Sequence, residues 1–258
     1  MLAIPLLFAQ GSGCCGPGTY TNGTGCDDCP VGSSCPGGFV DPTPCAAGRF
    51  AAVGGLAVCI SCEGGSYQDE AGATACKPCD AGSYCKAGAA APLPCDAGSY
   101  SRATNLAAAG ECTACPAGSA CSTGSVEPTP CSSGTFAAEE GQARCEACPP
   151  GTSSDRGSDS CDACEAGRYA ANADQGLCNR CPHPLSSVNG STTCSFCMED
   201  FYLLTTANTT ADDIFKSPTE YCKACPPNAA CPDNTTLSSL VLPPGFWRAS
   251  PSSAVLTA

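Results

Sequence analysis

The sequence predicts a fold of small disulfide-rich repeats: an elongated array of short β-hairpins and turns, with little helix and no large hydrophobic core. Three observations predict it. The 258 residues include 27 cysteines and 29 glycines. Eleven of the cysteines recur at a spacing of about sixteen residues. Leu, Ile, Val and Phe together number only 33, about 13 % of the chain, which is below the level of roughly 20 % typical of chains with a conventional core.

The recurring cysteines, called register cysteines below, follow one another at intervals of 16, 17, 17, 16, 20, 16, 17, 16, 17 and 16 residues. From Cys29 through Cys164, each has a glycine three residues later. A fixed period of this kind indicates a repeat architecture, and glycine permits the positive φ of a tight turn. The register cysteines are Cys29, Cys45, Cys62, Cys79, Cys95, Cys115, Cys131, Cys148, Cys164, Cys181 and Cys197.

The cellular compartment of the protein can be inferred from how such a chain must fold. Between Cys26 and Cys197 only sixteen of 172 residues are Leu, Ile, Val or Phe, so disulfides have to replace burial. Closing a loop of about fourteen residues stabilises by roughly 3 kcal/mol in the chain-entropy picture. Disulfides persist outside the cytosol, so we expect an extracellular or cell-surface protein that uses the secretory pathway. Four glycosylation sequons agree, at Asn22, Asn189, Asn208 and Asn234.

The N-terminal residues 1–13 predict a signal peptide, with a truncated leader as the alternative. Residues 2–9 are mostly apolar, as in a signal peptide. No basic residue precedes them and Pro5 interrupts them, which favours the alternative. No other stretch approaches the eighteen apolar residues of a membrane span, so membrane anchoring would have to come from a region absent from this chain.

The commonest unit within residues 14–197 reads Cys-x-x-Gly-x-aromatic, then a polar stretch, then Cys-x-x-Cys. One example runs from Cys62 through Gly65 and Tyr67 to Cys76 and Cys79. Two-stranded ribbons of this size need glycine at their turns. We expect each aromatic side chain to cover the disulfide of its own unit; these residues are Phe50, Tyr67, Tyr84, Tyr100, Phe136 and Tyr169.

A second kind of unit contains two cysteines six residues apart, and this spacing suggests that near neighbours pair. An interlaced pattern, such as Cys29 with Cys45 and Cys35 with Cys59, is the alternative, because spacing alone does not decide connectivity. Cys14 is left over and needs a partner elsewhere. The expected pairs are Cys15 with Cys26, Cys29 with Cys35, Cys45 with Cys59, Cys62 with Cys76, Cys79 with Cys85, Cys95 with Cys112, Cys115 with Cys121, Cys131 with Cys145, Cys148 with Cys161, Cys164 with Cys178, Cys181 with Cys194, Cys197 with Cys222 and Cys225 with Cys231.

These units resemble the ephrin-receptor-like cysteine-rich repeat, which is related to EGF-like and tumour-necrosis-factor-receptor-like modules. The resemblance rests on the Cys-x-x-Gly-x-Tyr units joined by Cys-x-x-Cys and covers residues 14–197. It implies extracellular spacer or recognition modules without catalysis. A receptor kinase is not implied, because the chain carries no kinase domain.

The repeat stops after Cys197. Residues 198–221 are apolar and acidic, and we expect a linker or insertion that forms a larger loop or a small hairpin. Residues 222–258 resume the motif as a partial cysteine-rich module with a C-terminal tail. In this tail, Trp247 is expected to be a packing anchor.

Other kinds of chemistry are disfavoured. Cys161-x-x-Cys164 with Cys178-x-x-Cys181 falls just short of a zinc-ribbon spacing, and we expect no metal or other cofactor. His183 is the only histidine and lies between prolines, so we expect an exposed loop residue rather than a catalytic one. A net charge of −13 argues against nucleic acid as a partner.

The expected function is therefore that of a non-catalytic, extracellular or cell-surface segment. It would act as a spacer, an adhesion module or a ligand-recognition ectodomain, with extracellular proteins or glycans as partners. Two alternatives stay open: a zinc-binding cysteine-rich protein, and a passive surface-coat antigen.

Overall fold

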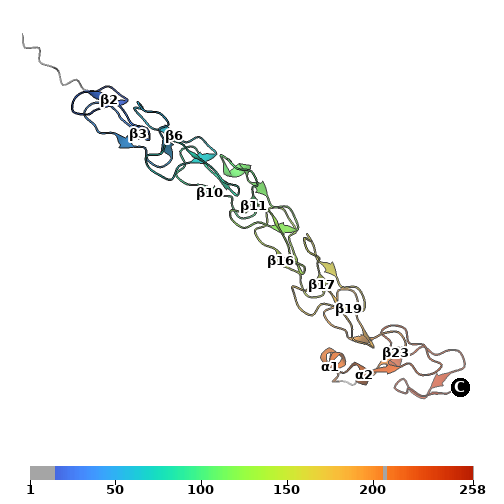
Figure 1. Ribbon diagram of the computed structural model, residues 1–258. Helices are drawn as coiled ribbons and strands as arrows, with labels where there is room; N and C mark the ends of the chain where they lie inside the picture. Colours follow the sequence, from blue (N-terminus) through green and yellow to red (C-terminus); the bar gives the residue numbers. More distant parts are fainter. Residues whose placement is uncertain (1–14, 206–207, 258) are drawn as a thin grey trace, which may run out of the picture. The chain divides into compact units, whose positions relative to one another are not determined.

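The structure is a computed structural model that describes residues 15–205 and 208–257. The chain divides into two compact units. Unit 1 holds the chain up to Ala114 together with Ser122–Glu127, and unit 2 holds Cys115–Cys121 together with the chain from Pro128 onward. Within each unit, short hairpins follow one another in chain order (Figure 1). The described residues form thirteen two-stranded antiparallel sheets and two short α-helices, so the small disulfide-rich repeat fold predicted above is confirmed.

Unit 1 consists of six hairpins and one turn of 3₁₀-helix. The extra residues between Cys95 and Cys115, where the interval is 20, contain this turn, η1 (Ala109–Glu111). The hairpins are β1 (Thr19–Thr21) with β2 (Cys26–Asp28), β3 (Ser33–Ser34) with β4 (Thr43–Pro44), β5 (Arg49–Phe50) with β6 (Ile60–Ser61), β7 (Ser66–Tyr67) with β8 (Lys77–Pro78), β9 (Ser83–Tyr84) with β10 (Leu93–Pro94), and β11 (Ser99–Tyr100) with β12 (Thr113–Ala114).

Unit 2 continues the same pattern and ends in a different module. Its hairpins are β13 (Ser119–Ala120) with β14 (Thr129–Pro130), β15 (Thr135–Phe136) with β16 (Glu146–Ala147), β17 (Thr152–Ser153) with β18 (Asp162–Ala163), β19 (Arg168–Tyr169) with β20 (Asn179–Arg180), β21 (Leu185–Ser186) with β22 (Phe196–Cys197), β23 (Phe201–Leu203) with β24 (Cys222–Ala224), and β25 (Trp247–Arg248) with β26 (Leu256–Thr257). Its helices are α1 (Ala211–Lys216), α2 (Pro218–Tyr221) and the 3₁₀ turn η2 (Leu237–Ser239).

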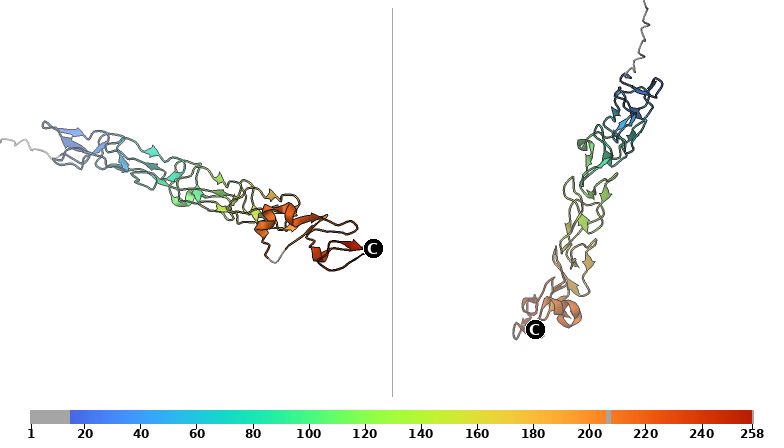
Figure 2. Two further views of the ribbon diagram at one scale, coloured as in Figure 1. Left: turned by 90° about the horizontal axis from the view of Figure 1, so that it is seen from below. Right: turned by 90° about the vertical axis from the view of Figure 1, so that its left-hand side faces the viewer.

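Within each unit, backbone hydrogen bonds join consecutive hairpins of the repeat array, which follow one another along the chain (Figure 2). In the loop of β7–β8, the Gly72 N–H donates to the carbonyl of Cys45 at 2.8 Å. In return, the Gly48 N–H donates to the carbonyl of Gln68 at 2.7 Å. The loop-to-cysteine bond recurs at every register cysteine from Cys29 to Cys164. Backbone groups that two-residue strands leave unpaired are thereby satisfied.

At seven register cysteines, the glycine three residues later has a second role besides its turn. Gly48 has φ of +83°, and a Cβ built there would lie 2.2 Å from the carbonyl oxygen of Gly88. Gly88 belongs to the hairpin after the next one. The same approach recurs at Gly32, Gly65, Gly118, Gly134 and Gly151. These repeats, and the one that contains Gly82, therefore contact the second repeat after them, and a side chain at this glycine would prevent that contact.

Two side-chain positions in each repeat contribute most of the interior of the array. The register cysteines are buried from Cys29 through Cys164. The residue six places after each register cysteine from Cys29 to Cys181 is buried too, at 4 % exposure or less, and in nine of these ten repeats it is Ala, Ser or Cys. These residues are Cys35, Ala51, Gln68, Cys85, Ser101, Cys121, Ala137, Ser154, Ala170 and Ser187.

The 198–221 segment is more regular than the loop or hairpin expected from sequence. Its first part, β23, pairs with β24, and α1 and α2 follow within the segment. Thr210 caps α1 in a capping box with Asp213, and the hydrogen bond from the Thr210 hydroxyl lowers the pKa of the Asp213 carboxyl. Ile214 on α1 is buried against the Cys197–Cys222 region. This apolar contact gives the helix a core that the polar repeats lack.

Candidate functional site

The disulfides are the dominant chemistry of the molecule. All 26 cysteines of the described residues are paired, in thirteen bonds with Cα–Cα separations from 5.5 to 6.0 Å. The pairs present are the near-neighbour pairs expected above, from Cys15–Cys26 to Cys225–Cys231. The interlaced alternative is not formed, since Cys29 bonds Cys35 and Cys45 bonds Cys59. Cys14 and the expected leader at 1–13 lie outside the described residues.

The near-zinc spacing does not form a thiolate cluster. Cys161 bonds Cys148, Cys164 bonds Cys178, and Cys181 bonds Cys194. A cysteine binds zinc through its thiolate sulfur, and these sulfur atoms are oxidised. Among residues 15–205 and 208–257 there is no group of three His, Cys, Asp or Glu side chains arranged to hold a metal ion.

The four sequon asparagines are all exposed. The side chain of Asn22 is the most engaged. Its Nδ2 donates to Asp27 Oδ2 at 2.7 Å, and its Oδ1 accepts the backbone N–H of Thr24 at 2.9 Å. Glycosylation at Asn22, Asn189, Asn208 and Asn234 stays a prediction.

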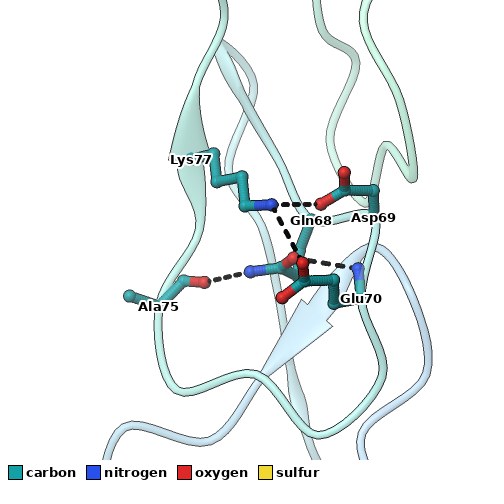
Figure 3. A network of polar contacts seen from close by, with 5 residues as sticks. All are labelled: Gln68, Asp69, Glu70, Ala75 and Lys77. Carbon is teal, nitrogen blue, oxygen red and sulfur yellow. Dashed lines mark hydrogen bonds and ion pairs between the residues drawn. The ribbon is translucent and has the colours of Figure 1, made fainter.

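A polar network crosses the β7–β8 hairpin (Figure 3). Gln68 is only 4 % exposed; its amide donates to the carbonyl of Ala75 at 2.7 Å and accepts the Glu70 N–H at 2.9 Å. On the surface beside it, Lys77 Nζ lies 2.6 Å from Asp69 Oδ1 and 3.7 Å from Glu70 Oε1. The hydrogen bond between them lowers the pKa of Asp69 and raises the pKa of Lys77. The network holds the loop of this hairpin.

The aromatic residues five places after the register cysteines are half-buried. Tyr169 packs edge-on against Phe215 of α1, with ring centroids 5.3 Å apart. Tyr169 therefore contacts the 198–221 segment. The sequence predicted only that it would cover the disulfide of its own unit. For the other five aromatic residues, packing over the disulfide of their own unit stays a prediction.

The exposure of Trp247 differs from what the sequence predicted. It lies in β25 and is 57 % exposed, so the packing-anchor expectation is wrong. Its neighbour Arg248 anchors the tail instead. The Arg248 guanidinium donates to the carbonyl oxygens of Leu237, Ser238 and Pro251.

The one histidine is exposed, as expected. Its ring lies edge-on to Phe201, with centroids 5.3 Å apart. It also lines a cleft of about 350 Å³ together with Arg168 and Arg180. This cation-lined cleft, defined by Arg168, Arg180 and His183, is a candidate binding site of the repeat array. Our sequence predictions did not include the two arginines. Comparing the same position across all repeats would have revealed them, because most repeats have small residues there.

No helix in the described part of the chain has the length and apolar character of a membrane span.

Comparison with known proteins supports the interpretation of the repeats. A family model described as tyrosine-protein kinase ephrin type A/B receptor-like matches residues 48–91, 118–156 and 151–189. No curated protein matches the chain. The matched stretches span hairpins of both units, and each shares the register cysteines, the glycine three residues later and the near-neighbour disulfides. The matched stretches, residues 48–91 and 118–189, are therefore similar to ephrin-receptor-like cysteine-rich repeats.

Proposed function

We propose that this chain is a non-catalytic segment of a secreted or cell-surface ectodomain. In this role it spaces a recognition surface and presents it to extracellular proteins or glycans. The observation that carries the proposal is the pairing of all 26 described cysteines, because a chain that depends on so many disulfides requires an oxidising compartment.

The arrangement of the repeats supports a spacing role. Each hairpin is held to its neighbours by the same few hydrogen bonds and by its own disulfide. In such arrays, stability is the sum of contributions from repeats and their nearest neighbours. Repeats can therefore be added without a new core, which suits a spacer.

The surface supports recognition rather than catalysis. The only histidine is exposed and has no carboxylate hydrogen-bonded to it within the described residues. A general base of the Ser-His type is oriented by such a partner. The cleft beside it is lined by cations and a hydroxyl group, which suits the binding of an anionic group.

The test is expression of the full chain through a eukaryotic secretory pathway with a C-terminal tag. We expect secreted protein whose non-reducing peptide map contains the thirteen disulfides, and a decrease in mass after glycosidase treatment. Retention in the cytosol with reactive thiols and bound zinc would instead support the metal-binding alternative and overturn the proposal. A coat antigen would be secreted equally, so binding to extracellular proteins and glycans separates that alternative.

A further inference from the structure

Two arginines face each other across one hairpin. In β19–β20, Arg168 and Arg180 are direct cross-strand partners. At the same place in seven other hairpins of the array, a Ser or Thr faces a Pro or Ala. In β5–β6, Arg49 faces Ser61. Among the described hairpins the paired cations therefore occur only in β19–β20.

No carboxylate among the described residues neutralises the charge of this arginine pair. Like charges directly opposite each other in an antiparallel pair are destabilising. Arg168 is held by a hydrogen bond from its Nη1 to the carbonyl of Cys178 at 3.0 Å, just as Arg49 is held by Cys59 at 3.2 Å. Arg180 makes no hydrogen bond or ion pair to any described side chain, and no carboxylate of residues 15–205 or 208–257 pairs with Arg168. The chain has 24 acidic residues and 11 basic ones, yet neither arginine pairs with a described carboxylate, which leaves both available to an external anion.

The residues around Arg168 and Arg180 complete a binding cleft. The cleft of about 350 Å³ is also lined by His183, Ser186, Leu185 and Met198, with no carboxylate among its lining residues. Leu185 is 3 % exposed and gives an apolar floor. His183 is oriented by its edge-on contact with Phe201. Asp162 and Glu165 line a different hollow, which Arg168 also lines.

The geometry points to a binding site for a carboxylate-bearing sugar residue of an extracellular glycan, held between Arg168 and Arg180. Each guanidinium presents N–H donors in a planar fork that matches a carboxylate. Cross-strand neighbours lie about 5 Å apart at Cβ, so both forks can reach one carboxylate. The inference rests on the proposed extracellular function and specifies the ligand class for this cleft.

The lining favours a sugar acid over an acidic side chain of a protein. Four polar side chains, including the His183 ring and the Ser186 hydroxyl, offer more hydrogen-bonding groups than one carboxylate needs. A sugar acid brings ring hydroxyls to these groups and an apolar C–H face to Leu185 and Met198. A long polyanion is disfavoured, because the net charge of −13 repels it.

The experiment is an NMR titration of the full secreted chain with D-glucuronic acid and, separately, with N-acetylneuraminic acid. Glucose serves as the neutral control, and the peptide acetyl-Gly-Glu-Gly-amide as the acidic peptide control. We expect saturable shifts at Arg168, Arg180 and His183 with a sugar acid, none with glucose, and weaker binding of the peptide. Arg180→Ser, which recreates the Arg–Ser pair of β5–β6, should weaken binding at least tenfold. Arg49→Ser, which removes an equal charge at the same repeat position of unit 1, should change it less than twofold.

The possible outcomes distinguish the binding site, the class of ligand and the proposed function from one another. No saturable shift with either sugar acid, or equal binding by Arg180→Ser, would overturn the site. Tighter binding of the peptide would overturn the glycan assignment and indicate a protein partner. The non-reducing disulfide map of each variant confirms that it has folded. A secreted, fully disulfide-bonded chain that binds neither sugar acid refutes this inference alone, whereas a reduced cytosolic chain refutes the proposed function.

Discussion

At the scale of single residues, a glycine three residues after a register cysteine can combine two constraints, a positive φ and a close carbonyl oxygen, and substitutions can separate them. Gly48 has a positive φ and a close carbonyl, Gly88 has φ of +72° with open space, and Gly110 has neither constraint. We expect Gly88→Ala to lower the free energy of unfolding by about 1–2 kcal/mol through backbone strain. Gly48→Ala should cost more, since the backbone of another repeat must move. Gly110→Ala should be neutral or slightly stabilising.

Denaturant unfolding of the three secreted variants measures this order. An equal loss at Gly48 and Gly88 would contradict the close approach between a repeat and the second one after it.

The buried sixth position predicts a strict size limit. Ala137 is fully buried, and its small side chain lies where neighbouring repeats meet. Ala137→Leu should destabilise by about 1–3 kcal/mol, because a close-packed site cannot accept the added carbons. Ala138→Leu is the matched control, since Ala138 is exposed and surface changes usually stay within about 0.5 kcal/mol. Comparable denaturation midpoints for the two variants would show that the site is not close-packed.

The Asp69–Lys77 pair predicts a dependence on pH at both ends of the scale. The hydrogen bond between the two side chains lowers the pKa of Asp69 from 3.8 and raises the pKa of Lys77 from 10.5. The contribution of Asp69 to stability is present above 3.8 and is lost as pH falls through its lowered pKa. The contribution of Lys77 is present below 10.5 and is lost as pH rises through its raised pKa. Both are therefore present near neutral pH, and both are small because the pair is exposed.

NMR titration of the side chains checks the direction. Asp69→Asn should move the pKa of Lys77 back toward 10.5, whereas Asp80→Asn should leave it unchanged. A Lys77 pKa that does not respond to Asp69→Asn would contradict the pairing.

At the scale of elements, a hairpin is a disulfide-closed loop, and loop length predicts how much each bond contributes. Cys79 and Cys85 are separated by six residues and Cys62 and Cys76 by fourteen. In the chain-entropy picture, the short loop contributes about 2 kcal/mol and the longer one about 3 kcal/mol. Replacing Cys62 and Cys76 by Ala should therefore lower the denaturation midpoint more than replacing Cys79 and Cys85. The reverse order would show that packing of the buried sulfur atoms outweighs loop closure.

At the scale of the whole molecule, the stability depends on oxidised sulfur rather than on metal or on buried hydrocarbon. Excess phosphine reductant should abolish the dispersed amide spectrum of the secreted chain, because the apolar residues are too few to hold it. The chelator EDTA should leave the spectrum unchanged. Thiol counting in denaturant should find at least 26 more reactive cysteines after reduction than before it, because the thirteen bonds hold 26 sulfur atoms. Loss of structure with EDTA alone would support the zinc alternative.

Much of this molecule could be predicted from its sequence because the determining contacts are local. The period, the turn glycines and the near-neighbour disulfides each involve residues within about one repeat. Spacing therefore constrains them directly. The leading interpretation as an extracellular repeat rests on the same local features.

Only the tertiary structure decided how the repeats interlock. The carbonyl of Gly88 against Gly48, the buried sixth position and the contact between Tyr169 and Phe215 all join residues from different elements. The facing of Arg168 and Arg180 depends on strand register, and the exposure of Trp247 depends on which neighbours reach it. These features depend on distances in space, and a sequence pattern constrains those distances only within a repeat.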